Sequence, residues 1–408
     1  IGSAAMYEKA KIGTKKLITD YVDEVVDALH HIETLPETEE LNHEDKIDFF
    51  HRARLCFGRS ALMMSGAGSL GHFHHGVGKT LIEQDLLPDV ISGSSAGSVF
   101  ASLLGTHTTD ELLELFETDL FQSPFDEQPR QQPWGLVRPQ VDPDQLKLML
   151  ERFIPDMTFQ EAYEKTGRSI SVTIAPHEEH QTSRLMNAVT SPNVYIRSAV
   201  MASCAVPGVF PPVMLMAKNV YGEPQPYLPN RRWVDGAVTD DLPAKRLSRL
   251  YAVNHYIVSQ ANPLSLAMLS TDKLIPLPSG TKSVMRHATR EMLKTSEQFS
   301  RKYLRQIPSA GQAMSMFYSV MAQDYTGDIN IAPSFNFVDP QKLLAQLSAK
   351  EIEELVSEGE RSTWPQIERI RISTKIGRTL DNILDNHTNH NIKKFYKKRT
   401  RSTKQANT

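Results

Sequence analysis

The sequence predicts an α/β protein with a parallel sheet. Between residues 61 and 105, short apolar strand-like segments alternate with helical ones, and a run of small residues joins each strand to the next helix. Strands that are separated by helices pair in parallel through right-handed crossovers. The chain has 408 residues, of which 40% are hydrophobic, so it is long enough for one large domain with an appendage.

The individual elements follow from the spacing of apolar residues. Leu17 to Ile32 recur at helical spacing opposite an acidic face, which predicts an amphipathic helix packed on the domain rather than on a membrane surface. A second short helix runs through Phe49 and Phe50, and the proline-rich segment 121–141 indicates a surface loop. We then expect strands over 61–64, 89–92, 169–175 and from Asn254, and helices over 73–86, 98–105, near Asp144, 349–359 and 364–384.

Composition excludes several classes of protein. The net charge of −3 argues against general nucleic-acid binding. Cys56 and Cys204 are the two cysteines, which is too few for a disulfide framework or a metal-spaced set, and we expect both thiols in the core. No apolar run approaches the roughly 20 residues of a membrane-spanning helix, and no secretory pattern opens the sequence. These features predict a cytoplasmic protein.

The segment Gly93-Ser94-Ser95-Ala96-Gly97 fits G-x-S-x-G, in which a serine stands at the apex of a sharp strand-to-helix turn. Glycines two positions to either side remove Cβ atoms that would collide with neighbouring backbone. The positive end of the following helix favours negative charge near the serine. Ser95 is therefore a candidate nucleophile.

A second glycine-rich loop, Gly66-Ala67-Gly68-Ser69-Leu70-Gly71, also follows a strand and opens a helix. Its backbone N–H groups are suited to an oxyanion that forms on the neighbouring strand. The same residues spell G-x-G-x-x-G, the dinucleotide-binding pattern. That alternative requires an acidic residue about 20 positions later, where this chain has Ser92 to Ser95 instead.

A nucleophilic serine needs a base. His255 follows Asp235 and completes the order Ser, Asp, His, although its place within the apolar segment NHYIV also suits a hydrogen-bonded core histidine. The other reading is that Asp235 itself takes the proton, its basicity raised by the apolar neighbours Trp233 and Val234. An Asp-Gly pair is also typical of a simple turn.

The motifs SGAGSLG, GSSAG and DGA, in this order, resemble those of the patatin-like phospholipase family. Further segments are similar to the subgroup of lipid-droplet acylglycerol lipases and lysophospholipases, among them VTSPNVYIRSAVMASCAVPGVFPP and WVDGAVTDDLPAKRL, and the resemblance covers about residues 15 to 385. It implies a three-layer sandwich with a central, mostly parallel sheet, an N-terminal helical extension and a helical C-terminal region. The implied site comprises Ser95 as nucleophile, Asp235 as base, Gly66, Ala67 and Gly68 as oxyanion hole, and Gly71, Gly93, Gly97 and Gly236 as motif glycines.

Two positions depart from the family pattern. Ala67 replaces the middle glycine of the usual triplet, which preserves the N–H if the φ angle there is negative, and Leu70 stands where many members have Arg or Lys. The loss of that charge weakens the case for an anionic phospholipid substrate but leaves ester hydrolysis untouched.

The resemblance leads to an expected organisation and activity. We expect a helical extension over 1–59, a catalytic domain over 60–260 and a helical region with a basic tail over 261–408. The expected activity is hydrolysis of a phospholipid, lysophospholipid or acylglycerol ester through a Ser-Asp dyad, with no cofactor, no metal and peripheral contact with a lipid surface. The alternatives are a catalytically silent lipid-binding protein of the same fold and a dinucleotide-binding oxidoreductase.

Three histidines follow the first glycine-rich loop. His72, His74 and His75 lack a carboxylate companion at ligand spacing, so packing and helix-capping roles are favoured over a metal site.

Overall fold

The structure is a computed structural model that describes residues 14–38, 41–117, 143–178, 181–207, 210–262, 327–334 and 347–405. The chain divides into two compact units. The first, which we call the helical unit, comprises Ile1–Ser60, Tyr251–His255 and Glu368–Thr408. The second comprises Ala61–Leu250 and Tyr256–Ile367, and we call it the catalytic unit because it contains the expected site residues Ser95 and Asp235. The boundaries expected from the sequence, at residues 59/60 and 260/261, stay a prediction.

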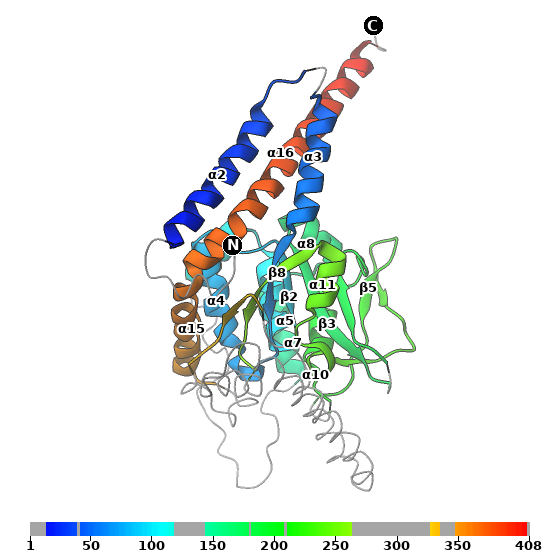
Figure 1. Cartoon of the computed structure of the whole chain (residues 1–408). Coiled ribbons are helices and arrows are strands. Elements are labelled where there is room, and N and C mark those ends of the chain that lie inside the picture. Colours follow the sequence, from blue (N-terminus) through cyan, green and yellow to red (C-terminus); the bar gives the residue numbers. More distant parts are fainter. Residues whose placement is uncertain are drawn as a thin grey trace, which may run out of the picture. The chain divides into compact units, whose positions relative to one another are not determined.

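Three helices dominate the helical unit and run alongside one another (Figure 1). They are α2 (Thr14–Thr34), α3 (His43–Phe57) and α16 (Ile367–Gln405). The first residue of α16, Ile367, belongs to the catalytic unit. Their shared core contains Leu29, Phe50, Leu380 and Ile383. Helix α3 begins at a capping box, in which the Asn42 side chain accepts from the backbone of the third helical residue and that residue's carboxylate accepts from Asn42. Both predicted N-terminal helices are thus present.

Helix α3 corrects one expectation, because Cys56 is exposed rather than in the core. The buried face of this helix carries Lys46, Phe50 and Arg54 at spacings of four residues. Cys56 is two residues beyond Arg54, about 200° around the helix, and therefore faces away from that core.

The sheet is mixed and mostly parallel, in the order β4-β3-β2-β1-β8-β9 with β7 paired to β3. Strands β1 and β2, β2 and β3, and β8 and β9 pair in parallel, whereas β4 and β7 run antiparallel to β3. The bounds of these strands are Arg59–Met64 (β1), Val90–Gly93 (β2), Ser169–Pro176 (β3), Arg184–Asn187 (β4), Trp233–Asp235 (β7), Val253–Ser259 (β8) and Ile329–Ile331 (β9). The predicted α/β class and the predicted strands are confirmed.

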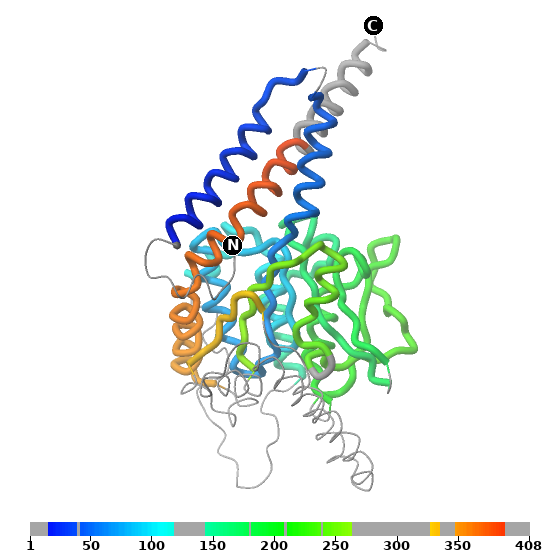
Figure 2. The backbone as a smooth tube through the Cα atoms, in the orientation of Figure 1, coloured from blue at the N-terminus to red at the C-terminus, as the bar shows by residue number. Residues whose placement is uncertain are grey.

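Helices and one small hairpin complete the catalytic unit. Helix α5 contacts β2 and β3, and α15 packs on α4 (Figures 1 and 2). The helices are α4 (His72–Glu83), α5 (Ala96–Thr106), α6 (Thr109–Glu117), α7 (Pro143–Phe153), α8 (Phe159–Thr166), α9 (Ile196–Ser203), α10 (Ala237–Asp240), α11 (Ala244–Tyr251, whose last residue belongs to the helical unit) and α15 (Ala349–Thr363), with 3₁₀ turns η1 (Gly68–Gly71) and η4 (Trp364–Gln366); β5 (Met216–Lys218) and β6 (Pro224–Pro226) form the hairpin.

Two expectations remain outside this description. The proline-rich segment 121–141 lies outside the described residues, and of the basic run 393–404 only the helical backbone is described. No helix in the described ranges combines the length and the apolar character needed to cross a bilayer.

Candidate active site

The two glycine-rich loops leave the sheet at the same edge. Strands β1 and β2 are parallel neighbours whose last residues, Met64 and Gly93, are in register. The chain continues from these ends into the loops of residues 65–68 and 94–97, and Ser94 N–H donates to Met64 O at 3.2 Å. The carboxyl edge of a parallel sheet is the usual place for a site in such folds.

Ser95 stands at the turn between β2 and α5 with φ 50° and ψ −127°. A positive φ is rare for a residue with a Cβ and marks stored backbone strain. A Cβ at Gly93 would overlap Gly97 O, and one at Gly97 would overlap Met64 O. The tight turn that presents Ser95 therefore requires glycine at both flanking positions.

The sheet register brings Asp235 to the same place. Ile174 of β3 pairs with Arg184 of β4 on one side and with Asp235 of β7 on the other. Strand β2 occupies the same side of β3 as β7, and its last residue pairs with Val172, two residues before Ile174. Strand β7 therefore pairs with the part of β3 that extends beyond the end of β2. This pairing places Asp235 close to the turn that carries Ser95.

Ser95 and Asp235 are in contact, because the Ser95 hydroxyl hydrogen-bonds to the Asp235 carboxyl group. Both are buried, with 8% and 3% of their surface exposed. Burial raises the pKa of Asp235 to about 7, and hydrogen bonds from the Ala237 N–H and from Ser95 offset part of that rise. The Ala237 N–H donates to Oδ1 at 2.8 Å. Such a carboxylate is a stronger base than an ordinary aspartate.

The first glycine-rich loop lies against Ser95. A Cβ at Gly66 would stand 3.5 Å from the Ser95 Cβ, and one at Gly71 would stand 2.8 Å from the Ala96 Cβ. Ala67 has φ −147°, so alanine fits there without strain, while Gly68 has φ 54°. The backbone of this loop therefore lies close to the turn that carries Ser95.

Asp241 is a site residue that the sequence analysis missed. Its Oδ1 accepts a hydrogen bond from Gly66 N–H at 2.6 Å, and its backbone oxygen accepts from Ser94 Oγ at 2.8 Å. It is fully buried, and burial raises its pKa well above the usual range, although the bond from Gly66 opposes that rise. Its neighbour in WVDGAVTDDLP is another aspartate, so no local pattern distinguishes it.

Ser203 is the second residue that sequence reasoning missed. Its Oγ accepts from Ser95 N–H at 2.8 Å and donates to Thr173 O at 2.7 Å. It thus ties the strained turn to strand β3. The only sequence signal is its place in the segment SAVMASCAVPG, which was part of the family resemblance.

The histidines have partners of their own. His255 lies in the helical unit, where its Nδ1 hydrogen-bonds with Ser60 Oγ at 2.9 Å. In the catalytic unit, His74 bonds through both ring nitrogens, to Ser259 Oγ at 2.7 Å and to Ser65 O at 2.9 Å. The rings of His72 and His75 pack against Phe100.

Burial lowers the pKa of His72 and His74 to about 4 and that of His75 to about 3. All three are therefore neutral at pH 7. Among the described residues, no group of three or more histidine, cysteine or acidic side chains is arranged to hold a metal ion.

Comparison with known proteins shows the family of the chain. Residues 62–247 match the sequence model described as patatin-like phospholipase, and residues 1–55 match one described as a domain of unknown function. Triacylglycerol lipase SDP1L of Arabidopsis thaliana is 36% identical over 91% of this chain and 48% of its own length. Triacylglycerol lipase 4 of Saccharomyces cerevisiae is 33% identical over 91% of this chain and 43% of its own length.

Two further matches are a relative that is named only by its patatin-like domain and a solved structure. A patatin-like phospholipase domain-containing protein of Pyricularia oryzae is 34% identical over 92% of this chain and 49% of its own length. The crystal structure of VipD from Legionella pneumophila matches with a TM-score of 0.33 and 12% identity, over 76% of this chain and 67% of that one. The chain spans about half the length of the curated relatives that it matches.

The fold and the site define an α/β protein with a serine on a strand-to-helix turn, in contact with a buried aspartate. The chain belongs to the patatin-like phospholipase family.

Proposed function

We propose that this chain hydrolyses carboxylic esters of long-chain acyl lipids. The observation that carries this proposal is the buried hydrogen bond between the Ser95 hydroxyl and the Asp235 carboxyl group. A serine hydroxyl is a weak nucleophile until a neighbouring base accepts its proton. With a pKa of about 7, Asp235 is ionised in a substantial fraction of molecules at neutral pH and is basic enough for that role.

The proposed reaction has two steps. Ser95 Oγ attacks the ester carbonyl carbon while its proton passes to Asp235, and Asp235 then protonates the departing alcohol oxygen as the C–O bond breaks. The product is an acyl-Ser95 ester. Water then attacks this ester and gives a proton to Asp235, which returns it to Ser95 Oγ as the carboxylic acid leaves.

We propose that the amides of the first glycine-rich loop stabilise the negative oxygen of each tetrahedral intermediate. The Gly66 N–H is engaged by Asp241, which holds the loop, so Ala67 and Gly68 are the amides best suited to face the oxyanion. One donor of this kind is typically worth about 2.7 to 4 kcal/mol of the barrier.

An acylglycerol is the first substrate to test. Two relatives are named triacylglycerol lipases. Leu70 stands where many family members carry a cation, and its uncharged side chain offers no charge to an anionic head group. This favours an uncharged ester over an anionic phospholipid, and a water-insoluble substrate would require contact with a lipid surface.

Hydrolysis of a p-nitrophenyl ester and labelling with a fluorophosphonate test the proposal. We expect activity in the unsubstituted protein, none in Ser95→Ala, and a fluorophosphonate adduct that maps to Ser95. Ser102→Ala is the matched control, because Ser102 is buried in helix α5, which follows Ser95, and its hydroxyl has no hydrogen-bond partner among the described residues. Equal rates in Ser95→Ala and the unsubstituted protein would overturn the proposal.

The same experiment separates the two alternatives. A catalytically silent lipid-binding protein would show neither turnover nor labelling. A dinucleotide oxidoreductase would be stabilised by a dinucleotide in a thermal-shift measurement, and membership of the patatin-like family favours the ester hydrolase over it.

A further inference from the structure

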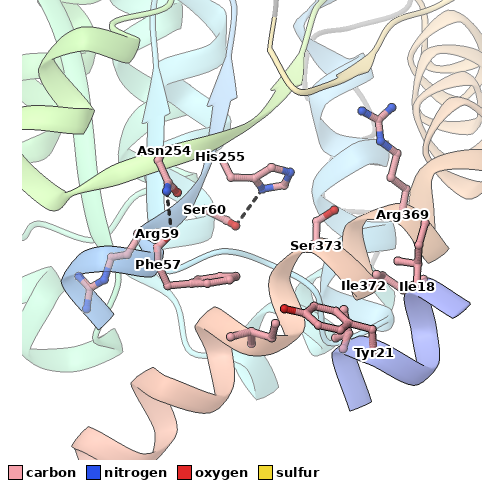
Figure 3. Close-up of a pocket in the computed structure, with 13 residues that line it drawn as sticks. Ile18, Tyr21, Phe57, Arg59, Ser60, Asn254, His255, Arg369, Ile372 and Ser373 are labelled. Atoms are coloured by element: carbon pink, nitrogen blue, oxygen red, sulfur yellow. Dashed lines mark hydrogen bonds between the residues drawn. The ribbon is translucent and has the colours of Figure 1, made fainter. Parts of the chain in front are cut away.

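The histidine that completes the order Ser, Asp, His is held in the helical unit. Figure 3 shows His255 beside Ser60, whose Oγ lies 2.9 Å from the His255 Nδ1. Both residues line a cavity of about 400 Å³ in that unit, whose walls also include Arg369. His255 thus has a partner of its own, and the groups that fix Ser95 come from the catalytic unit.

Both backbone groups of Ser95 are engaged by serine side chains. Its N–H donates to Ser203 Oγ at 2.8 Å, and its carbonyl oxygen accepts from Ser98 Oγ at 2.6 Å. Ser98 belongs to α5, the helix that begins directly after Ser95, whereas Ser203 is the last residue of a separate helix, α9. Since a φ of 50° is unfavourable for serine, the turn keeps this conformation only because its surroundings fix it.

Ser203 is itself fixed on its other side. It is fully buried, and its hydroxyl donates to Thr173 O at 2.7 Å. Thr173 precedes Ile174 of β3, which pairs with Asp235 of β7. One hydroxyl group therefore joins the backbone of Ser95 to β3, the strand with which β7 and Asp235 pair.

The residues that follow Ser203 hold the candidate base in a similar way. Asp235 N–H donates to Ala205 O at 2.9 Å. Between the two lies Cys204, and burial raises the pKa of its thiol, with a further rise from the nearby negative charge of Asp235. The thiol is therefore neutral. Segment 203–205, at the end of the mostly buried helix α9, thus contacts the backbones of both Ser95 and Asp235.

We propose that Ser203 is a positioning residue, which sets the place of the Ser95 hydroxyl relative to the Asp235 carboxyl group. Its own hydroxyl is committed to the backbone of Ser95 and Thr173, so it acts on the reaction through Ser95 rather than on the substrate. The inference rests on the proposed function, because the place of Ser95 affects catalysis only if Ser95 is the nucleophile.

Steady-state hydrolysis of a p-nitrophenyl ester by Ser203→Ala is the first test. This variant leaves the buried Ser95 N–H without its acceptor, so we expect the turn to relax and kcat to fall about 10- to 100-fold, with a change in KM of less than about threefold. Ser198→Ala is the matched control, because Ser198 lies on the same helix and its hydroxyl also bonds two backbone groups, Tyr195 O and Met216 N–H. Equal kcat values in the two variants would refute the role of Ser203.

Ser203→Cys separates hydrogen bonding from packing. Cysteine fills nearly the same volume as serine, but its sulfur makes only weak hydrogen bonds. Positioning through hydrogen bonds predicts a loss of kcat close to that of Ser203→Ala. A kcat near that of the unsubstituted protein would show that Ser203 serves only as packing, and it would overturn the proposal even if Ser203→Ala does not fold.

The titration of Asp235 gives a readout that needs no turnover. Burial raises the pKa of Asp235, and the hydrogen bond from the Ser95 hydroxyl offsets part of that rise, so displacement of Ser95 should raise the pKa further. Carboxyl ¹³C NMR of aspartate-labelled protein, assigned with Asp235→Asn, should show the titration about 0.5 to 1 pH unit higher in Ser203→Ala. In a Ser95→Ala background the same substitution should cause no such change, because the serine hydroxyl is already absent. An unchanged titration in Ser203→Ala alone would contradict the positioning role.

The two proposals fail in distinguishable ways. Absence of ester hydrolysis in the unsubstituted protein would remove the proposed function, but the Asp235 titration would still decide whether Ser203 holds Ser95 against Asp235. Hydrolysis by the unsubstituted protein, with the same rate and the same titration in Ser203→Ala, would remove the positioning role alone.

Discussion

The backbone N–H of Gly66 donates a hydrogen bond to Oδ1 of Asp241 at 2.6 Å within the catalytic unit. The backbone oxygen of Asp241 accepts a second bond from Ser94 Oγ. One buried residue therefore joins the glycine-rich loop that lies against Ser95 to the turn that presents Ser95. We therefore expect Asp241 to be a positioning residue, which acts on the proposed reaction through the two loops that it holds.

Removal of this link is expected to slow ester hydrolysis. Asp241→Ala leaves the buried Gly66 N–H without its acceptor, and a displacement of about 1 Å in a positioning element can cost about 100-fold in rate, so we expect kcat to fall about 10- to 100-fold. Asp241→Asn keeps an acceptor oxygen and resembles the protonated carboxyl group that the raised pKa favours, so its kcat is expected to stay near that of the unsubstituted protein.

Steady-state kinetics with a p-nitrophenyl ester and the rate of fluorophosphonate labelling measure this effect. Asp240→Asn is the control, because the neighbouring Asp240 pairs with Arg246 instead. An unchanged kcat in a folded Asp241→Ala variant would contradict the positioning role.

The pH dependence of catalysis is expected to follow Asp235. If this carboxyl group accepts the serine proton, only its ionised form is active, and its pKa is about 7 because burial disfavours the charge. We therefore expect kcat/KM to rise about tenfold per pH unit below about pH 7 and to level off above it. A profile that is already flat from pH 5, as an ordinary aspartate would give, would show that Asp235 does not act as this base.

The same burial is expected to lower the stability of the native protein at alkaline pH. The pKa of Asp235 is higher in the folded state, about 7, than the ordinary value of 3.8, so the folded state binds the proton more tightly. The stabilisation from this proton is complete below pH 3.8 and is lost as the pH rises through about 7.

Asp235→Asn cannot ionise and escapes this loss. Between pH 4 and pH 8, its free energy of unfolding, measured in urea, is expected to increase by about 2 to 4 kcal/mol relative to that of the unsubstituted protein. Asp110→Asn, at an exposed position, should show no such gain. A difference that stays constant with pH would argue against a buried, ionisable Asp235.

The strained backbone at Ser95 predicts that replacing this residue changes the stability of the protein as well as its activity. Its φ of 50° is unfavourable for any residue with a Cβ and costs about 1 to 3 kcal/mol. Ser95→Gly and Ser95→Ala should both be inactive, but the glycine variant is expected to be more stable by about 1 kcal/mol despite its greater chain entropy when unfolded. Thermal unfolding of the two variants side by side measures this, and greater stability of Ser95→Ala would show that the turn is not strained.

The sequence alone was sufficient for the elements whose signals are local. Alternating strands and helices predicted β1, α4, β2 and α5 to within a few residues, because apolar periodicity and glycine placement are properties of short segments. The strand-to-helix turn that carries Ser95 was predictable for the same reason. Its two glycines and its serine lie within five residues, and the turn geometry itself imposes them.

Contacts between distant segments required the tertiary structure. Asp235 lies 140 residues after Ser95, and only the antiparallel pairing of β7 with β3 brings the two side chains together. The roles of Asp241 and Ser203 left no local signal, because a buried carboxylate or hydroxyl acquires its function from the partners that folding supplies. The cavity beside Arg369 was likewise unpredictable, since its walls come from four separate segments whose spacing depends on packing rather than on periodicity.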